Sequence, residues 1–85
     1  MSEFIAEMEK GWNEKIVFGL SEFKGKKYAD IRIYYEDDEG EWKPTKKGVT
    51  VSLDRFYEFR ENLQKLEEFL LENGHIEKPE EPAQE

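Results

Sequence analysis

Residues 26–36 read Lys-Lys-Tyr-Ala-Asp-Ile-Arg-Ile-Tyr-Tyr-Glu, and this stretch decides the fold. Its odd positions from 29 to 35 are Ala, Ile, Ile and Tyr, whereas its even positions are Lys, Tyr, Asp, Arg and Tyr. Successive side chains of a β-strand point to opposite faces of a sheet. The alternation therefore predicts a strand with one aliphatic face and one face that carries cations and aromatic rings.

Further strands are expected on both sides of this segment. Residues 15–23 are rich in β-branched and aromatic side chains and end at the turn Lys24-Gly25-Lys26. Asp37–Gly40 predicts a hairpin turn in which Gly40 takes a positive φ. The return strand begins at Glu41 and is interrupted by Pro44. The strands predicted here are residues 15–23, 26–36, 41–43 and 49–51.

A helix is expected to follow the last strand. Ser52 is a good N-cap residue, and Asn73-Gly74 is a typical helix end. Apolar residues recur between them at steps of three and four, which gives a stripe along one side of the helix. We interpret this stripe as a dimer interface as well as a source of core contacts; its residues are Phe56, Phe59, Leu63, Leu66 and Leu70.

The two ends of the chain differ from its middle. Residues 1–14 are rich in Glu, and the spacing of Phe4, Ile5, Met8 and Trp12 predicts one or two turns of amphipathic helix, interrupted by Gly11. Residues after Gly74 contain two prolines and several glutamates, and we expect them to be disordered. The predicted organisation is an N-terminal extension at 1–14, one domain at 15–73 and an acidic tail at 74–85.

Composition limits the classes of function. The 85 residues include no cysteine, and the net charge is −8. These numbers fit one small domain without disulfides. No apolar stretch reaches the roughly 20 residues that span a bilayer, and the first residues lack the pattern of a signal peptide, so we expect no membrane partner. Net charge argues against nucleic acid, but residues 15–53 alone carry +1.

Cations and aromatic rings are interleaved in that middle region. Lysine and arginine side chains hold phosphates, and rings stack on unpaired bases, so the pattern favours single-stranded nucleic acid. An ordinary solvated strand face with turn lysines is the alternative. The set comprises Phe23, Lys24, Lys26, Tyr28, Arg32, Tyr34, Tyr35, Trp42, Lys43, Lys46 and Lys47.

Catalytic and metal sites are not indicated. The acids Asp37, Asp38, Glu39 and Glu41 lack the spacing of a calcium loop around Gly40. His75 is the one histidine and has no neighbouring cysteine or aspartate. We therefore expect no enzyme activity, no cofactor and no metal.

Several motifs of the middle region resemble the positive cofactor four family of transcriptional coactivators and their prokaryotic relatives, which bind single-stranded DNA. The motifs are Phe23-Lys24-Gly25-Lys26, Asp30-Ile31-Arg32, Tyr34-Tyr35, Glu39-Gly40-Glu41, Lys43-Pro44 and Lys46-Lys47-Gly48. The resemblance covers about residues 15–71 without a gap.

The resemblance implies an α+β fold of the whirly-like kind: a curved four-stranded antiparallel sheet followed by a C-terminal helix, assembled as a homodimer. It implies that each sheet holds single-stranded DNA without sequence preference, in transcription regulation, replication or repair. Carried over by position, the DNA contacts are Phe23, Lys24, Gly25, Lys26, Arg32, Tyr35, Lys43, Lys46 and Lys47.

The chain also departs from the family. Tyr35 stands where tryptophan is common, and a regular strand would point it away from Lys26 and Arg32. Ile16 and Ser21 stand where the eukaryotic coactivator has arginines. The long regulatory arm of the eukaryotic member is absent, which points to a prokaryotic relative in the cytoplasm, near the nucleoid, rather than a nuclear protein. Single-stranded RNA, or a basic protein partner for the acidic helix, stay open as alternative partners.

Overall fold

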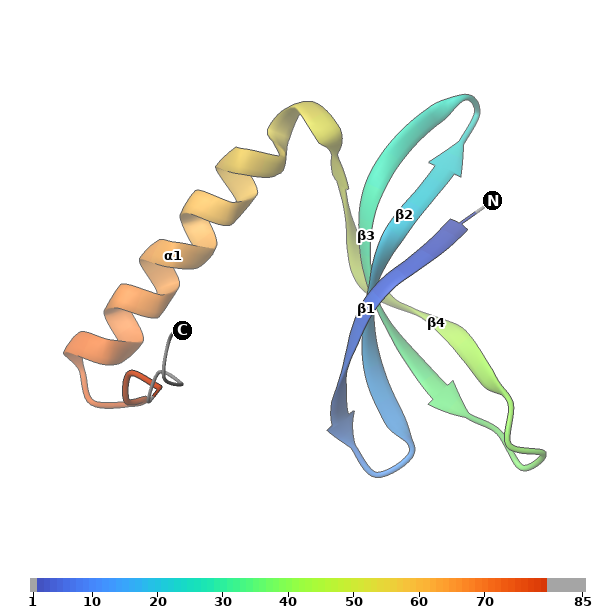
Figure 1. Cartoon of the computed structure of the whole chain (residues 1–85), viewed down its shortest axis with the longest axis horizontal. Helices are drawn as coiled ribbons and strands as arrows, with labels where there is room; N and C mark the ends of the chain where they lie inside the picture. The colour runs from blue at the N-terminus through green and yellow to red at the C-terminus, as the bar shows by residue number, and fades with distance from the viewer. Residues whose placement is uncertain (1, 80–85) are drawn as a thin grey trace, which may run out of the picture.

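In the computed structural model, which describes residues 2–79, the chain forms one open antiparallel sheet followed by one long helix (Figure 1). The strands are β1 (Ser2–Gly11), β2 (Glu14–Phe23), β3 (Lys26–Glu36) and β4 (Trp42–Ser52). They pair in sequence order, each with the next. A short 3₁₀ helix, η1 (Leu53–Arg55), leads into α1 (Phe56–Glu72). This architecture confirms the fold class predicted from the sequence.

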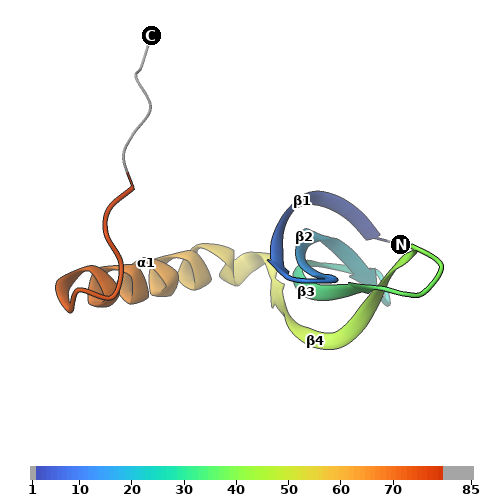
Figure 2. The ribbon, with the colours of Figure 1, turned by 90° about the horizontal axis from the view of Figure 1, so that it is seen from below.

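The sheet is strongly curved and twisted. Strands β1 and β4 bend round on opposite sides of β2 and β3, while the helix extends away from the sheet (Figure 2). We call the face that carries Val17, Arg32 and Tyr34 the inner face, because Val17 and Tyr34 are the two buried apolar residues of the described chain. The outer face carries the aliphatic rows of β2 and β3, Ile16, Phe18, Leu20, Ala29, Ile31 and Ile33.

The prediction of a helix within residues 1–14 is wrong. Residues 2–11, which the sequence analysis placed in an extension ahead of the domain, form the edge strand β1 and pair with β2. Ile5 is an extra residue in that pairing, so Phe4 lies opposite Gly19 on the inner face and Ala6 lies opposite Phe18 on the outer face. The apolar spacing of this segment, which resembled a helix, reflects a bulged strand.

Strand β4 is longer than the sequence predicted. The two short strands expected at 41–43 and 49–51 belong to one strand that continues through Pro44. β4 is an edge strand, where a proline without a backbone N–H is tolerated. Three residues of β4, 45–47, lie opposite the single β3 residue between Arg32 and Tyr34, so the bulge lies in β4 near Thr45. Gly48 is required beside it, since a Cβ there would lie 2.6 Å from the carbonyl oxygen of Ile31.

The turns and helix ends largely follow the sequence. The β2–β3 turn places Lys24 and Gly25 at φ 52° and 81°, and Gly40 has the positive φ expected of it. The helical segment begins directly after Ser52, although the Ser52 side chain makes no capping hydrogen bond. Gly74 has φ 74°, and the N–H of His75 donates to Leu70 O at 2.9 Å, which closes the helix in a Schellman motif.

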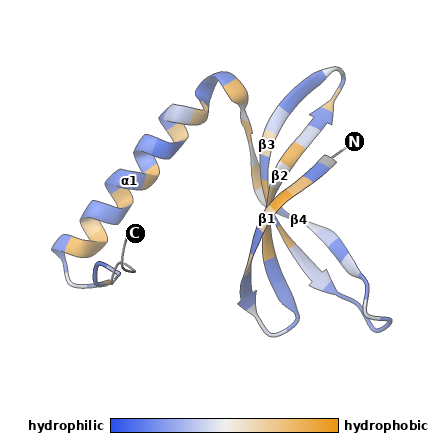
Figure 3. Ribbon diagram, in the orientation of Figure 1, coloured by the Kyte–Doolittle hydropathy of each residue, from blue (hydrophilic) through white to orange (hydrophobic). Residues whose placement is uncertain are grey.

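Helix α1 packs against little of its own chain. Its main contacts with other elements are those with η1 and β4. Figure 3 shows hydrophobic residues recurring between hydrophilic ones along its length. Within residues 2–79 the helix is neither long nor apolar enough to cross a membrane. Of the acidic tail expected to be disordered after Gly74, residues 80–85 lie outside the described residues.

Candidate nucleic-acid interface

The β2–β3 hairpin gathers four of the predicted contact residues. Phe23 and Lys26 pair across the two strands, and Lys24 and Gly25 form the turn between them. The Phe23 ring is 65% exposed, and the Lys24 ammonium lies 5.3 Å from its centroid. Lys24 and Lys26 have no ion-pair partner among residues 2–79. The hairpin therefore offers an open ring with uncompensated positive charge beside it.

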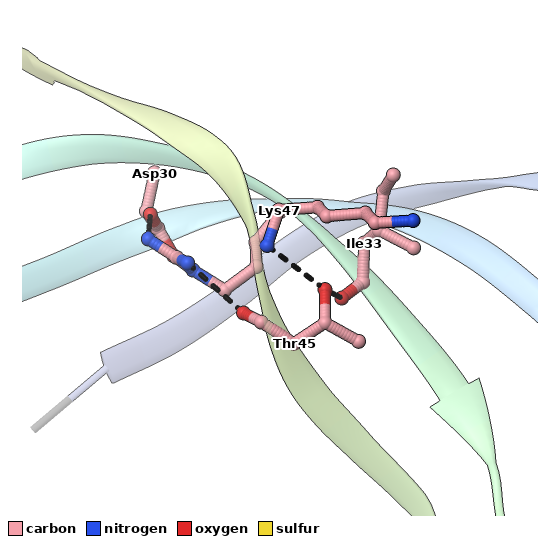
Figure 4. A network of polar contacts seen from close by, with 5 residues as sticks. Asp30, Ile33, Thr45 and Lys47 are labelled. Carbon is pink, nitrogen blue, oxygen red and sulfur yellow. Dashed lines mark hydrogen bonds and ion pairs between the residues drawn. The ribbon is translucent and has the colours of Figure 1, made fainter.

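Arg32 lies on the same face as Phe23 and Lys26, in the middle of the sheet. Its Nη2 and Nε donate to the two carboxylate oxygens of Asp30 at 3.0 and 3.3 Å, and its Nη1 donates to Thr45 O at 3.0 Å (Figure 4). The hydrogen bond to Asp30 raises the pKa of Arg32 above its usual value. In contrast to the hairpin lysines, this cation is held by neighbours.

Strand β4 supplies two further exposed cations, Lys46 and Lys47. Both lie in the bulged part of β4, where Thr45 Oγ1 donates to Ile33 O at 2.7 Å and accepts the N–H of Lys47 at 3.1 Å. Neither lysine has an ion-pair partner in the described chain. The threonine thus fixes the backbone from which these two charges project.

Tyr35 and Lys43 are not brought onto the inner face by strand pairing. They pair with each other across β3 and β4, and β3 keeps a regular register with β2 through this region, so both alternate with Arg32 onto the outer face. The bulge in this region lies in β4 and not in β3, so it does not change the direction of the Tyr35 side chain. The Lys43 ammonium also lies 3.1 Å from the Asp37 carboxylate. Only the twist of the strands could bring these two side chains toward the hairpin residues.

Asp37 organises the β3–β4 turn. Its Oδ1 accepts the N–H groups of Glu39 and Glu41, both at 2.9 Å, and its Oδ2 faces Lys43. The hydrogen bond from Glu41, followed by the one from Lys43, lowers the pKa of Asp37. The carboxylates of Asp37, Glu39 and Glu41 lie close together, but the turn itself accounts for the position of Asp37.

The opposite end of the inner face is acidic. A pocket of about 460 Å³ lies between the β1–β2 turn and the far ends of β3 and β4, and its lining includes Glu7, Glu9, Glu14, Glu36, Trp12 and Trp42. Lys15 is the one cation of that lining; its ammonium lies 2.9 Å from Glu7 and 4.4 Å from the Trp42 ring centroid. Trp12 is 92% exposed. Phosphates are disfavoured here despite the two indoles.

The sequence analysis did not predict that β1 contributes residues to the inner face. The Phe4 and Tyr34 rings pack edge to face, with their centroids 5.3 Å apart. Phe4 on β1 therefore covers Tyr34 on β3. The alternation of Phe4, Ala6 and Met8 with glutamates at 3, 7 and 9 was a period-two signal for a strand. It competed with the helical spacing of the same apolar residues.

The predicted dimer-interface residues lie along α1. None of its residues is buried within the single chain, and Leu63 and Leu66 are 55% and 52% exposed. Leu63, Leu66 and Leu70 also line a pocket on the helix together with Ile76. A stripe of this kind requires a cover that the single chain does not provide.

Comparison with known proteins gives a consistent picture. The family model described as Transcriptional Coactivator p15 (PC4) matches residues 9–62. The PC4 homolog from Burkholderia pseudomallei, in its tetragonal crystal form, matches with a TM-score of 0.73 at 21% identity, over 79% of this chain and 98% of that chain. At this identity the likeness shows the fold.

Two further solved structures are similar. A complex of MoSub1 with ssDNA matches with a TM-score of 0.61 at 30% identity, over 85% of this chain and 83% of that chain. The bacteriophage T5 homolog of the eukaryotic transcription coactivator PC4, described as implicated in recombination-dependent DNA replication, matches with a TM-score of 0.50 at 27% identity. That match covers 88% of this chain and 86% of the phage protein.

Proposed function

This chain belongs to the family of the transcriptional coactivator p15 (PC4), and from this premise we propose that it binds single-stranded DNA as a homodimer. Binding is largely independent of sequence, serves transcription, replication or repair, and involves no catalysis. Relatives in bacteria and in a bacteriophage support a prokaryotic setting, with the protein in the cytoplasm.

The observation that carries this proposal is the β2–β3 hairpin. It combines the exposed Phe23 ring with the unpaired charges of Lys24 and Lys26, and all three belong to the stretch matched by the family. A ring stacks on an unpaired base for about 1–3 kcal/mol, whereas a duplex hides the faces of its bases. The hairpin therefore favours single-stranded over double-stranded DNA.

The remaining contacts extend from the hairpin along the sheet. Lys46 and Lys47 neutralise phosphates, and Gly25, which has no side chain, allows the DNA strand to come close to the protein backbone. Arg32 lies between these groups on the inner face. Tyr35 and Lys43 join the site only through the twist of the sheet, so we assign them to one end of the DNA path.

Homodimer formation follows from what the single chain leaves uncovered. Val17 and Tyr34 alone are buried apolar residues in the described chain, and no residue of the apolar stripe on α1 is buried. A second copy that covers the stripe would supply the missing core. The residues proposed for this interface are Phe56, Phe59, Leu63, Leu66 and Leu70.

Fluorescence titration with labelled oligonucleotides tests the function. We expect a dT strand to bind more tightly than a duplex of the same length, and to lose affinity steeply between 50 and about 200 mM salt. A matched RNA strand tests the alternative that RNA is the ligand, since a stacking surface need not distinguish the 2′-OH. Equal affinity for dT and duplex, or no binding to either, contradicts the proposal.

Light scattering in solution tests the dimer. The wild-type chain is expected at twice its monomer mass, and Leu66→Asp is expected at the monomer mass with reduced stability. Glu68→Ala, on the side of the helix away from Leu66, is the control and keeps the dimer. A monomeric wild-type chain would contradict this part of the proposal.

A further inference from the structure

Arg32 differs from the other cations of the proposed site in how its donors are used. A guanidinium has five N–H donors, and three of those of Arg32 are bound: two to the Asp30 carboxylate and one to the Thr45 carbonyl. Thr45 is itself fixed by its hydroxyl, which donates to Ile33 O. The guanidinium is therefore held in one orientation before any ligand arrives, and two of its N–H groups have no hydrogen-bond partner among residues 2–79.

Glycines surround this pair on the inner face. Gly19 lies opposite Asp30 on β2, and Gly48 lies opposite Arg32 on β4. A Cβ at Gly19 would lie 2.2 Å from Glu3 O, and one at Gly48 would lie 2.9 Å from the Arg32 Cα. Close strand packing thus excludes side chains from both neighbouring positions, and neither strand can cover the guanidinium with one.

The charge of Arg32 is compensated, unlike that of the hairpin lysines. Its side chain is 24% exposed and that of Asp30 is 17% exposed, and they form an ion pair at 3.0 Å. An ion pair with little net charge neutralises little phosphate charge, so contact with it releases few of the cations condensed on DNA. Phosphate neutralisation is therefore the role that Arg32 is least suited to.

We infer that Asp30 is a positioning residue that converts Arg32 from a phosphate-neutralising cation into a fixed contact for a base. In this arrangement the lysines hold the phosphates, while Arg32 binds a base through its flat face or its two remaining N–H groups. This inference rests on the proposed function and assigns the base-dependent part of the affinity to Asp30, Arg32 and Phe23.

An abasic strand, which carries the phosphates and sugars without bases, separates the two roles. Affinities for dT and for an abasic strand of the same length are measured for the wild type and variants over a series of salt concentrations. Arg32→Ala should lower the affinity for dT about tenfold, leave the abasic affinity nearly unchanged and keep the salt slope. Lys26→Ala should weaken both strands alike and reduce the slope by about 0.7.

Asp30→Asn tests the positioning role. Releasing Arg32 should raise the affinity for the abasic strand and lower the ratio of dT to abasic affinity, an effect that a merely destabilised sheet would not produce. Arg32→Lys is a second variant that keeps the charge without the planar fork, and it should lower the same ratio. Circular dichroism and solution mass verify that each variant is folded.

The outcomes separate this inference from the proposed function. If wild-type protein fails to bind dT, the proposed function itself is wrong. If wild-type protein binds dT but Arg32→Ala weakens dT and abasic strands equally and reduces the slope, Arg32 is a phosphate contact and the inference is overturned. An unchanged ratio in Asp30→Asn also overturns the role assigned to Asp30.

Discussion

The two ends of the inner face share exposed aromatic rings and differ in charge. At the β2–β3 hairpin, Phe23 lies beside unpaired lysines. At the β1–β2 turn, Trp12 is even more exposed but lines a pocket with four glutamates. An exposed ring is therefore a candidate for stacking on bases only where the charge around it does not repel phosphate. The net charge of −8 hides this contrast, because it is the sum over the whole chain, including the acidic helix and tail.

Reversing the charge of the basic end should have the largest effect on DNA binding. The double substitution Lys24→Glu and Lys26→Glu removes two phosphate contacts and adds two repulsive charges. We expect the affinity for dT to fall by about 100-fold or more at 50 mM salt. Glu9→Gln and Glu36→Gln, at the acidic end, are the matched control and should change the affinity by less than about threefold. Comparable losses in both pairs would show that the two ends do not differ in function.

Removing the exposed ring at each end tests whether only the basic end stacks on bases. Phe23→Ala should cost about 1–3 kcal/mol of binding free energy for dT, the value of one stacked base. Trp12→Ala removes a larger and more exposed ring from the acidic end and should cost less than about 0.5 kcal/mol. Titration of both variants with the same oligonucleotide measures the difference. A larger loss for Trp12→Ala would place the DNA at the acidic end.

Lys24 links the charge of the basic end to backbone strain. It has φ 52°, a left-handed conformation that costs a typical residue about 1–2 kcal/mol and that asparagine adopts more readily. Lys24→Asn should therefore raise the free energy of unfolding by about 0.5–1 kcal/mol while it weakens dT binding several-fold. Denaturant unfolding at one protein concentration measures the first effect, because the stability of a dimer depends on concentration. Lower stability in this variant would show that Lys24 is not strained.

The smallest expected effect concerns the β3–β4 turn. Folding lowers the pKa of Asp37 from its ordinary value of 3.8, so the folded state favours the carboxylate. The stability from this group is present above pH 3.8 and is lost as the pH falls through the lowered pKa. Wild type should therefore unfold at a higher temperature than Asp37→Asn at pH 5, and the gap should close toward pH 2. A gap that persists at pH 2 would contradict this role.

Sequence patterns predicted the parts of the fold that depend on local chemistry. The alternation in residues 26–36 predicted β3, Gly25 and Gly40 marked the β2–β3 and β3–β4 turns, and Gly74 marked the end of α1. The same reasoning failed for residues 1–14, because the apolar spacing there fits both a helix and a strand with an extra residue at Ile5. The bulge exists only in pairing with β2, so no property of the segment alone predicts it.

Sequence patterns alone were enough to locate β2, β3, the turns that follow them and the helix, and to show that cations and rings gather between residues 23 and 47, because these features follow from backbone preferences and side-chain period. Only the tertiary structure shows which of those groups lie on the same face and contact one another. Strand pairing places Arg32 with Phe23 and Lys26, turns Tyr35 away, and binds Arg32 to Asp30 and Thr45. Such contacts depend on the register and curvature of neighbouring strands, which distant residues fix.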